Sequence, residues 1–206
     1  MIELIKSGGW LMLPILLCSV VALAIVIERF WALQAQKINP DFLLGRIRRW
    51  HDQQQLNSDR IRALHDHSPL GRVLAAGLSN LDTSRELMKE SIEETGRHVV
   101  LELERFLNTL GTIASITPLM GLLGTVIGMI KVFAVITEQG VGDPTVLSGG
   151  ISEALITTAA GLTVAIPSVA FHRYFRGRVN ELVLEMEQEA IRMVEVIHGE
   201  RSDNQG

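Results

Sequence analysis

Apolar residues are concentrated in three long blocks of the chain rather than scattered among short elements. The blocks cover residues 10–33, 110–136 and 144–171, and each is about as long as the roughly 20 residues that a helix needs to cross a bilayer core. No segment shows the strict alternation of apolar and polar residues that is typical of strands. The pattern therefore predicts an all-α integral membrane protein with three transmembrane helices.

Basic residues are distributed unevenly around these blocks and predict the orientation of the spans. Of the 19 Lys and Arg, 12 lie from Arg29 to Arg105 and five lie from Arg173 onward. The positive-inside rule then places both of these regions in the cytoplasm and the N-terminus outside. The resulting layout has an outer N-terminus (1–9), a cytoplasmic helical segment (34–109), an outer loop (137–143) and a cytoplasmic helix with a tail (172–206).

The first block has a second interpretation, as a cleaved signal peptide ending near Ala22-Leu23-Ala24. Its apolar run is long and its basic flank follows the run rather than preceding it, which favours an uncleaved span. The single cysteine, Cys18, lies within this block, so no internal disulfide is expected.

The second and third spans are predicted to continue as helices into the cytoplasm. Apolar positions recur with helical spacing from Met88 to Leu110, without a Gly-Pro stop, and again from Val179 to Ile197. We therefore expect one uninterrupted helix leading into the second span and another running on from the third. Two such extensions with apolar stripes are expected to pack as a cytoplasmic helical bundle.

Small residues form one narrow face on each of these two spans. Such faces allow helix backbones to approach closely in a membrane. We interpret the glycines on them as helix-packing residues: Gly121, Gly124 and Gly128 in the second span, and Gly150 and Gly161 in the third. Thr125, Thr157 and Thr158 lie on or beside the same faces, where a threonine can also return its hydroxyl bond to its own helix.

Glu153 is a carboxylate within the third apolar block. It follows Pro144 by nine residues, which corresponds to a depth of about 13 Å at 1.5 Å per residue. Carboxylates are costly in hydrocarbon and usually functional there. No Lys or Arg lies within one turn of Glu153 in the sequence. We therefore expect it either to be protonated or to face a hydrated cavity or pore, together with Thr157.

The motif GLLGTVIGM (121–129), followed by GGISEALITTAAGLTVAIPSVAF (149–171), resembles the ExbB/TolQ family, which is distantly related to the flagellar stator protein MotA. The resemblance covers about residues 105–198 and favours ExbB or an ExbB-like paralogue over TolQ. MotA has four spans, whereas three are predicted here, so a flagellar stator is disfavoured.

The resemblance implies a subunit of the bacterial inner membrane, with a periplasmic N-terminus and a cytoplasmic C-terminus, that is not an enzyme and needs no cofactor or metal. It implies a homopentamer around the transmembrane helices of an ExbD-like single-span protein, embedded in membrane lipid. Proton motive force would then energise a TonB-like protein for TonB-dependent transport. The family's pore-lining threonines fall on Thr125 and Thr158, and its membrane glutamate falls on Glu153.

An intramembrane enzyme and a passive channel are the two alternatives to an energy-transducing subunit. An enzyme working within the membrane needs a nucleophile with a base, an aspartate pair or metal ligands there, and no histidine lies inside a predicted span. A passive oligomeric channel or scaffold that needs no partner is the second alternative. Nucleic acid is not expected as a partner.

Overall fold

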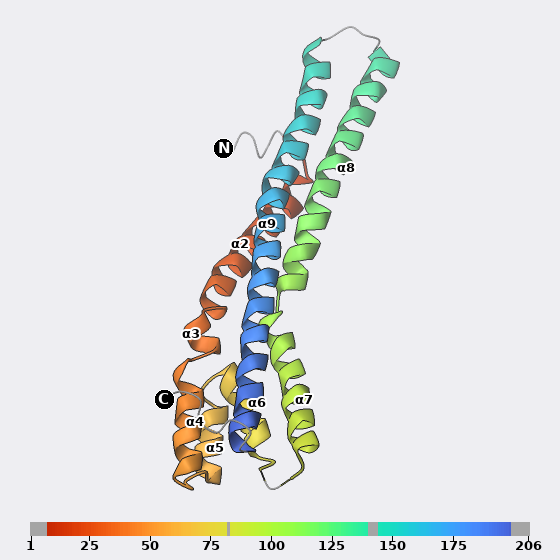
Figure 1. Cartoon of the computed structure of the whole chain (residues 1–206). Coiled ribbons are helices and arrows are strands. Elements are labelled where there is room, and N and C mark those ends of the chain that lie inside the picture. The colour runs from red at the N-terminus through yellow and green to blue at the C-terminus, as the bar shows by residue number, and fades with distance from the viewer. Residues whose placement is uncertain (1–7, 82, 140–143, 199–206) are drawn as a thin grey trace. The chain divides into compact units, whose positions relative to one another are not determined.

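The computed structural model describes residues 8–81, 83–139 and 144–198, and no strand occurs within these ranges. The helices are, in chain order, α2 (Met12–Ala32), α3 (Ala35–Ile38), α4 (Phe42–Asp52), α5 (Ser58–His65), α6 (Pro69–Leu78), α7 (Arg85–Leu103), α8 (Leu107–Gln139) and α9 (Pro144–Ile197) (Figure 1). Three of them, α2, α8 and α9, are long and apolar enough to cross a membrane. The predicted all-α membrane protein with three spans is therefore confirmed. Most of the predicted outer segments 1–9 and 137–143, and the end of the tail 172–206, lie outside the described residues.

One compact unit, which we call the membrane unit, contains Met1–Glu28 and Phe106–Tyr174. Its described surface carries many large apolar side chains, among them Leu17, Leu119 and Phe133, which are 60–66% exposed. An apolar surface of this extent is unfavourable in water. Lipid solvates it without cost, and helices satisfy their own backbone hydrogen bonds there. The composition of this unit is thus that of a helical bundle dissolved in a bilayer.

The second compact unit, which we call the helical unit, contains Arg29–Arg105 and Phe175–Gly206. In it α6 packs against both α5 and α7. A Cβ added to Gly77 of α6 would lie 2.7 Å from Met193 Cε and 2.8 Å from Ile92 Cδ1, so α6 also approaches α9 closely. The core of this unit is apolar and includes Leu43, Ile47, Leu70, Leu74, Met88, Leu182 and Met193.

Two polar side chains tie the chain's early helices to later ones inside the helical unit. Arg29, which is 4% exposed, donates from Nη1 to the carbonyl of Leu103 at 3.0 Å, where its charge complements the C-terminal end of α7. Asn39 donates from Nδ2 to the carbonyl of Leu182 at 2.9 Å and to Glu185 Oε2 at 3.0 Å. These buried bonds fix the start of the helical unit against α7 and α9.

The expectation of one uninterrupted helix leading into the second span was wrong. The helix α7 ends at Leu103 and α8 begins at Leu107, and Phe106 between them has a left-handed backbone with φ +63°. A residue in this conformation cannot continue a right-handed helix. The apolar periodicity did not reveal the break, because Met88 and Leu110 are fully buried on either side of it.

By contrast, α9 continues without interruption from Pro144 to Ile197, as the sequence pattern predicts. Pro167 lies inside it, and proline is tolerated in membrane helices because neighbouring groups satisfy the backbone that it frees. The next residue, Ser168, donates its hydroxyl to the carbonyl of Val164 on the same helix at 2.7 Å.

An ion pair on the helical unit gives a stability test. Arg72 of α6 binds Glu102 of α7 with two hydrogen bonds, one of them 2.8 Å from Nη1 to Oε1. The hydrogen bond from Arg72 lowers the pKa of the Glu102 carboxyl. A lowered folded-state pKa contributes stability above the unfolded pKa, and that stability is lost as the pH falls through the folded value.

We expect Glu102→Gln to lower the thermal midpoint of the detergent-solubilised protein at neutral pH and to have no effect in acid. The loss should be at most about 1 kcal/mol, because exposed ion pairs are screened by solvent and the Glu102 side chain is 57% exposed. Glu93→Gln is the control, since its pair with Arg97 is 67–74% exposed and should contribute less. Circular dichroism melting over a pH series measures both. A loss that does not change with pH would contradict the prediction.

Candidate functional site

The helices α8 and α9 of the membrane unit meet along their glycine faces. A Cβ added to Gly121 would lie 3.0 Å from Thr158 Cα, and one added to Gly161 would lie 2.6 Å from the carbonyl oxygen of Thr117. Backbone atoms cannot move aside as a flexible side chain can. Added Cβ atoms would also meet the opposite helix within 3 Å at Gly124, Gly128 and Gly150. All five glycines thus lie where the neighbouring helix leaves no room for a Cβ, and at Gly121 and Gly161 the limiting atoms are backbone.

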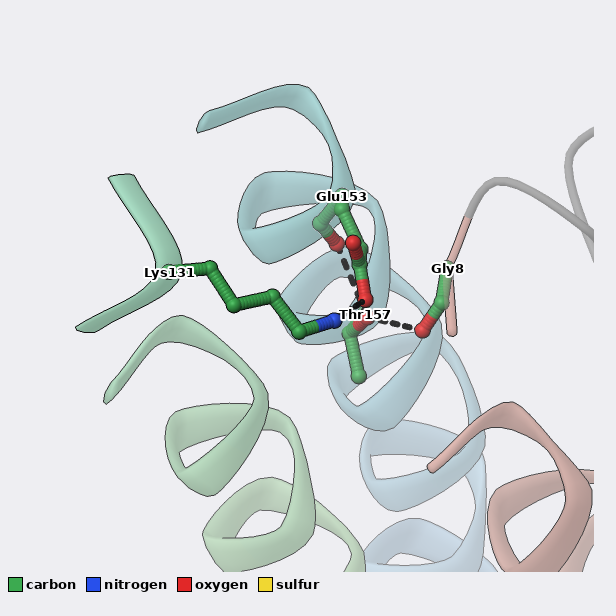
Figure 2. A network of polar contacts seen from close by, with 4 residues as sticks. All are labelled: Gly8, Lys131, Glu153 and Thr157. Carbon is green, nitrogen blue, oxygen red and sulfur yellow. Dashed lines mark hydrogen bonds and ion pairs between the residues drawn. The ribbon is translucent and has the colours of Figure 1, made fainter. Parts of the chain in front are cut away.

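Glu153 of α9 forms an ion pair across this contact. Lys131 Nζ of α8 lies 2.7 Å from Glu153 Oε1 (Figure 2). In the isolated subunit the lysine side chain is 52% exposed and the glutamate side chain is 27% exposed. The sequence argument considered only cations near Glu153 along its own helix, and it missed the one that approaches from the neighbouring helix. A third arrangement therefore occurs, in which the carboxyl group is paired with a lysine of the same chain.

Thr157 connects the same site to the segment that precedes α2. Its side chain is 1% exposed, and its hydroxyl lies 2.7 Å from the carbonyl oxygen of Gly8 and 2.8 Å from that of Glu153 (Figure 2). Gly9, which follows Gly8 in the chain, has φ +69°, and a Cβ there would collide with Glu153 Oε1. Only glycine combines this left-handed backbone with so close an approach.

The charged pair lies well inside both spans. Glu153 follows the start of α9 at Pro144 by nine residues, and Lys131 precedes the end of α8 at Gln139 by eight. At 1.5 Å per residue these separations correspond to about 13 Å and about 12 Å. The two charges thus lie at similar distances from the C-terminal end of α8 and the N-terminal end of α9. We call Lys131, Glu153, Thr157 and Gly8 the polar node, because it joins α8 and α9 to the segment that precedes α2.

The other two candidate threonines lie outside the polar node. The Thr158 hydroxyl donates to the carbonyl of Gly121 at 2.8 Å, across the contact between α8 and α9. The Thr125 hydroxyl donates to the carbonyl of Leu122 at 2.6 Å, on its own helix. Thr158 follows Glu153 by five residues, which places it about 140° around α9. The structure thus brings Glu153 and Thr157 together but directs Thr158 toward a different side of the helix.

Sequence reasoning missed three members or neighbours of the site, and each left a trace. Lys131 is a cation within an apolar block, six residues before the predicted outer loop, and Glu153 follows that loop by ten residues. Gly8 and Gly9 form a glycine pair directly before the first span, and such pairs mark close approaches or unusual backbone conformations. Comparing depths across adjacent spans would have found the lysine, but nothing in the sequence identifies the target of the glycine pair.

Comparison with known proteins gives consistent matches. Residues 65–188 match the model of the MotA/TolQ/ExbB proton channel family. An ExbB-like biopolymer transport protein of Synechocystis sp. is 35% identical over 163 residues, which is 78% of this chain and 64% of that protein. The biopolymer transport protein ExbB of Aquifex aeolicus is 31% identical over 71% of this chain and 97% of its own length. The Tol-Pal system protein TolQ of Haemophilus influenzae is 33% identical over 50% of this chain and 46% of its own length.

The glycine contact leads to a packing prediction. Gly161→Ala should destabilise the protein by about 1–3 kcal/mol, as overpacking does elsewhere, because its new Cβ would press on the Thr117 carbonyl. Gly149→Ala is the matched control: it lies on the same helix, and a Cβ there would meet nothing within 4 Å. It should be neutral or slightly stabilising. Thermal unfolding of the purified protein measures both, and equal midpoints would show that the backbones do not depend on this contact.

Proposed function

The chain belongs to the MotA/TolQ/ExbB proton channel family, and we propose that it is the multi-pass inner-membrane subunit of a motor driven by proton motive force. Five copies would surround the transmembrane helices of an ExbD-like single-span protein, with their N-termini in the periplasm. The assembly would energise a TonB-like protein and, through it, transport across the outer membrane. The protein's role is that of a channel and transport subunit, with no catalytic reaction of its own.

One observation carries this proposal. Within the apolar blocks 10–33, 110–136 and 144–171, Glu153 is the one carboxylate more than two turns from the end of a block, and it already has a partner in Lys131. A proton relay across a bilayer core of about 30 Å needs more than a single titrating site. The chain therefore needs carboxylates from another protein to complete a proton path. An acidic single-span partner supplies them.

The relatives favour an ExbB-like role over a TolQ-like role. The ExbB-named protein of Aquifex matches a larger share of this chain than the TolQ of Haemophilus does, 71% against 50%. A TolQ-like role in the envelope remains the second candidate, because the TolQ match has a similar identity of 33%. Deleting the protein separates the two: loss of siderophore-dependent growth indicates the first role, and loss of outer-membrane integrity with normal uptake indicates the second.

The partner requirement can be tested directly. The tagged full-length protein, purified from its native membrane, should bring down a small single-span protein with an acidic residue in its span. Proteoliposomes holding only this protein should show slow proton flux across a pH gradient, and addition of the partner should increase it. Fast flux without any partner would mean that the chain forms a passive channel by itself, and the proposal would be wrong.

The two threonines carried over from the family give a second test. We expect Thr125→Val and Thr158→Val to assemble normally and to reduce energy coupling, since valine keeps the shape and removes the hydroxyl. Thr163→Val is the matched control, because it removes a hydroxyl bond of the same kind, 2.8 Å to the carbonyl of Ala159 on its own helix. Transporter-dependent uptake measures the effect. If all three variants support normal uptake, Thr125 and Thr158 are packing residues only.

A further inference from the structure

The charge of Lys131 has a role that the family comparison does not supply. A carboxylate taken out of water alone is strongly disfavoured, and it either gains a proton or finds a cation. Glu153 has the cation, at 2.7 Å. From this geometry we propose that Lys131 is the positioning residue of the polar node: it keeps Glu153 ionised and holds its carboxylate in place in the resting subunit.

The contact between the two backbones keeps Lys131 and Glu153 within reach of each other. Gly128 precedes Lys131 by less than one turn, and a Cβ there would lie 2.8 Å from Ala154 Cβ and 3.1 Å from the Gly150 carbonyl oxygen. The backbones of α8 and α9 are therefore in contact within a turn of both charges. Lysine is long enough to extend away toward the membrane surface, yet here it crosses to the neighbouring helix.

The opposite side of the carboxylate is bounded by backbone. The left-handed Gly9 lies against Glu153 Oε1, and Thr157 binds the neighbouring carbonyl of Gly8 at 2.7 Å. The carboxylate is thus held between a cation on α8 and the segment before α2 (Figure 2). To leave this position it must either lose the lysine or displace Gly8 and Gly9.

This arrangement links protonation to the geometry of the spans. A proton on Glu153 would abolish its attraction for Lys131, and a carboxylate without Lys131 would remain unpaired in apolar surroundings. The ionised form of Glu153 and the paired position of Lys131 therefore depend on each other. This inference concerns the charge of Glu153 itself. Only the consequence of this charge for transport rests on the proposed function.

Infrared spectroscopy of the purified full-length protein in lipid nanodiscs at neutral pH tests the proposal. Protonated carboxylic acids show a C=O stretching band that ionised carboxylates lack. The wild-type protein and Lys131→Arg should show no such band from Glu153, because both keep the cation. Lys131→Met keeps an extended apolar chain without charge, so it should gain a band, and the double variant Lys131→Met/Glu153→Gln should lose that band. Lys89→Met, at an exposed lysine of α7, is the control and should leave the spectrum unchanged.

Two results would overturn the proposal. One is a wild-type band that disappears in Glu153→Gln, which would mean that the carboxyl is protonated beside the lysine. The other is an identical spectrum for Lys131→Met and the double variant, which would mean that Glu153 stays ionised without it. The first comparison needs no Lys131 variant and stands even if Lys131→Met fails to fold. Neither readout depends on transport, so failure of the proposed motor function would leave this result intact.

A double-mutant cycle provides a second readout on the same variants. Glu153→Gln leaves the Lys131 charge unpaired inside a span, and Lys131→Met leaves Glu153 either unpaired or forced to take up a proton, whereas removal of both charges avoids these costs. The double variant should therefore melt at a higher temperature than either single variant. Additive losses would show that the two side chains act independently and would contradict the pairing.

Discussion

The close approach of α8 and α9 is the constraint on which the other features of the membrane unit depend. Gly161 lies against the Thr117 carbonyl and Gly121 lies against Thr158, so neither helix can shift without a backbone collision. The short distance between α8 and α9 determines which side chains can reach across the contact. The Thr158 hydroxyl meets the Gly121 carbonyl, and Lys131 meets Glu153, because small residues keep the helices near enough.

Close packing of this kind also explains how the chain tolerates charges within its spans. Removing one partner of a buried ion pair typically costs about 3–5 kcal/mol, whereas replacing both with apolar residues is often neutral. Packing therefore gives no reason to place Lys131 and Glu153 here, since leucine at both positions would serve. A pair retained at such a depth is better understood as a device that holds a titratable group in a defined state.

The sequence was sufficient to predict the features that depend on continuous or periodic runs of apolar or small residues. The three spans, the continuity of α9 and the narrow glycine faces all follow from periodicity and composition. It was insufficient to predict which residues of two segments come into contact, or where a single backbone angle ends a helix. Nothing around Phe106 signals its left-handed conformation, because apolar periodicity reports burial, and buried positions such as Met88 and Leu110 occur on both sides of the break. Likewise Lys131 becomes the partner of Glu153 only once the register of α8 against α9 is known.

The angular separation of Glu153 from Thr158 limits how the polar node can act on a proton path. The two side chains point in directions about 140° apart around α9: the Thr158 hydroxyl binds the Gly121 carbonyl, and Glu153 binds Lys131 and lies against the segment before α2. Direct proton transfer between Glu153 and a carboxylate beside Thr158 is then unfavourable. A fixed charge acts over longer distances when the surroundings are poor in water, since the effective dielectric constant is low. The closed pair of Lys131 and Glu153 carries no net charge, whereas a proton on Glu153 would leave the single positive charge of Lys131, so the electric field of the polar node depends on whether Glu153 is ionised.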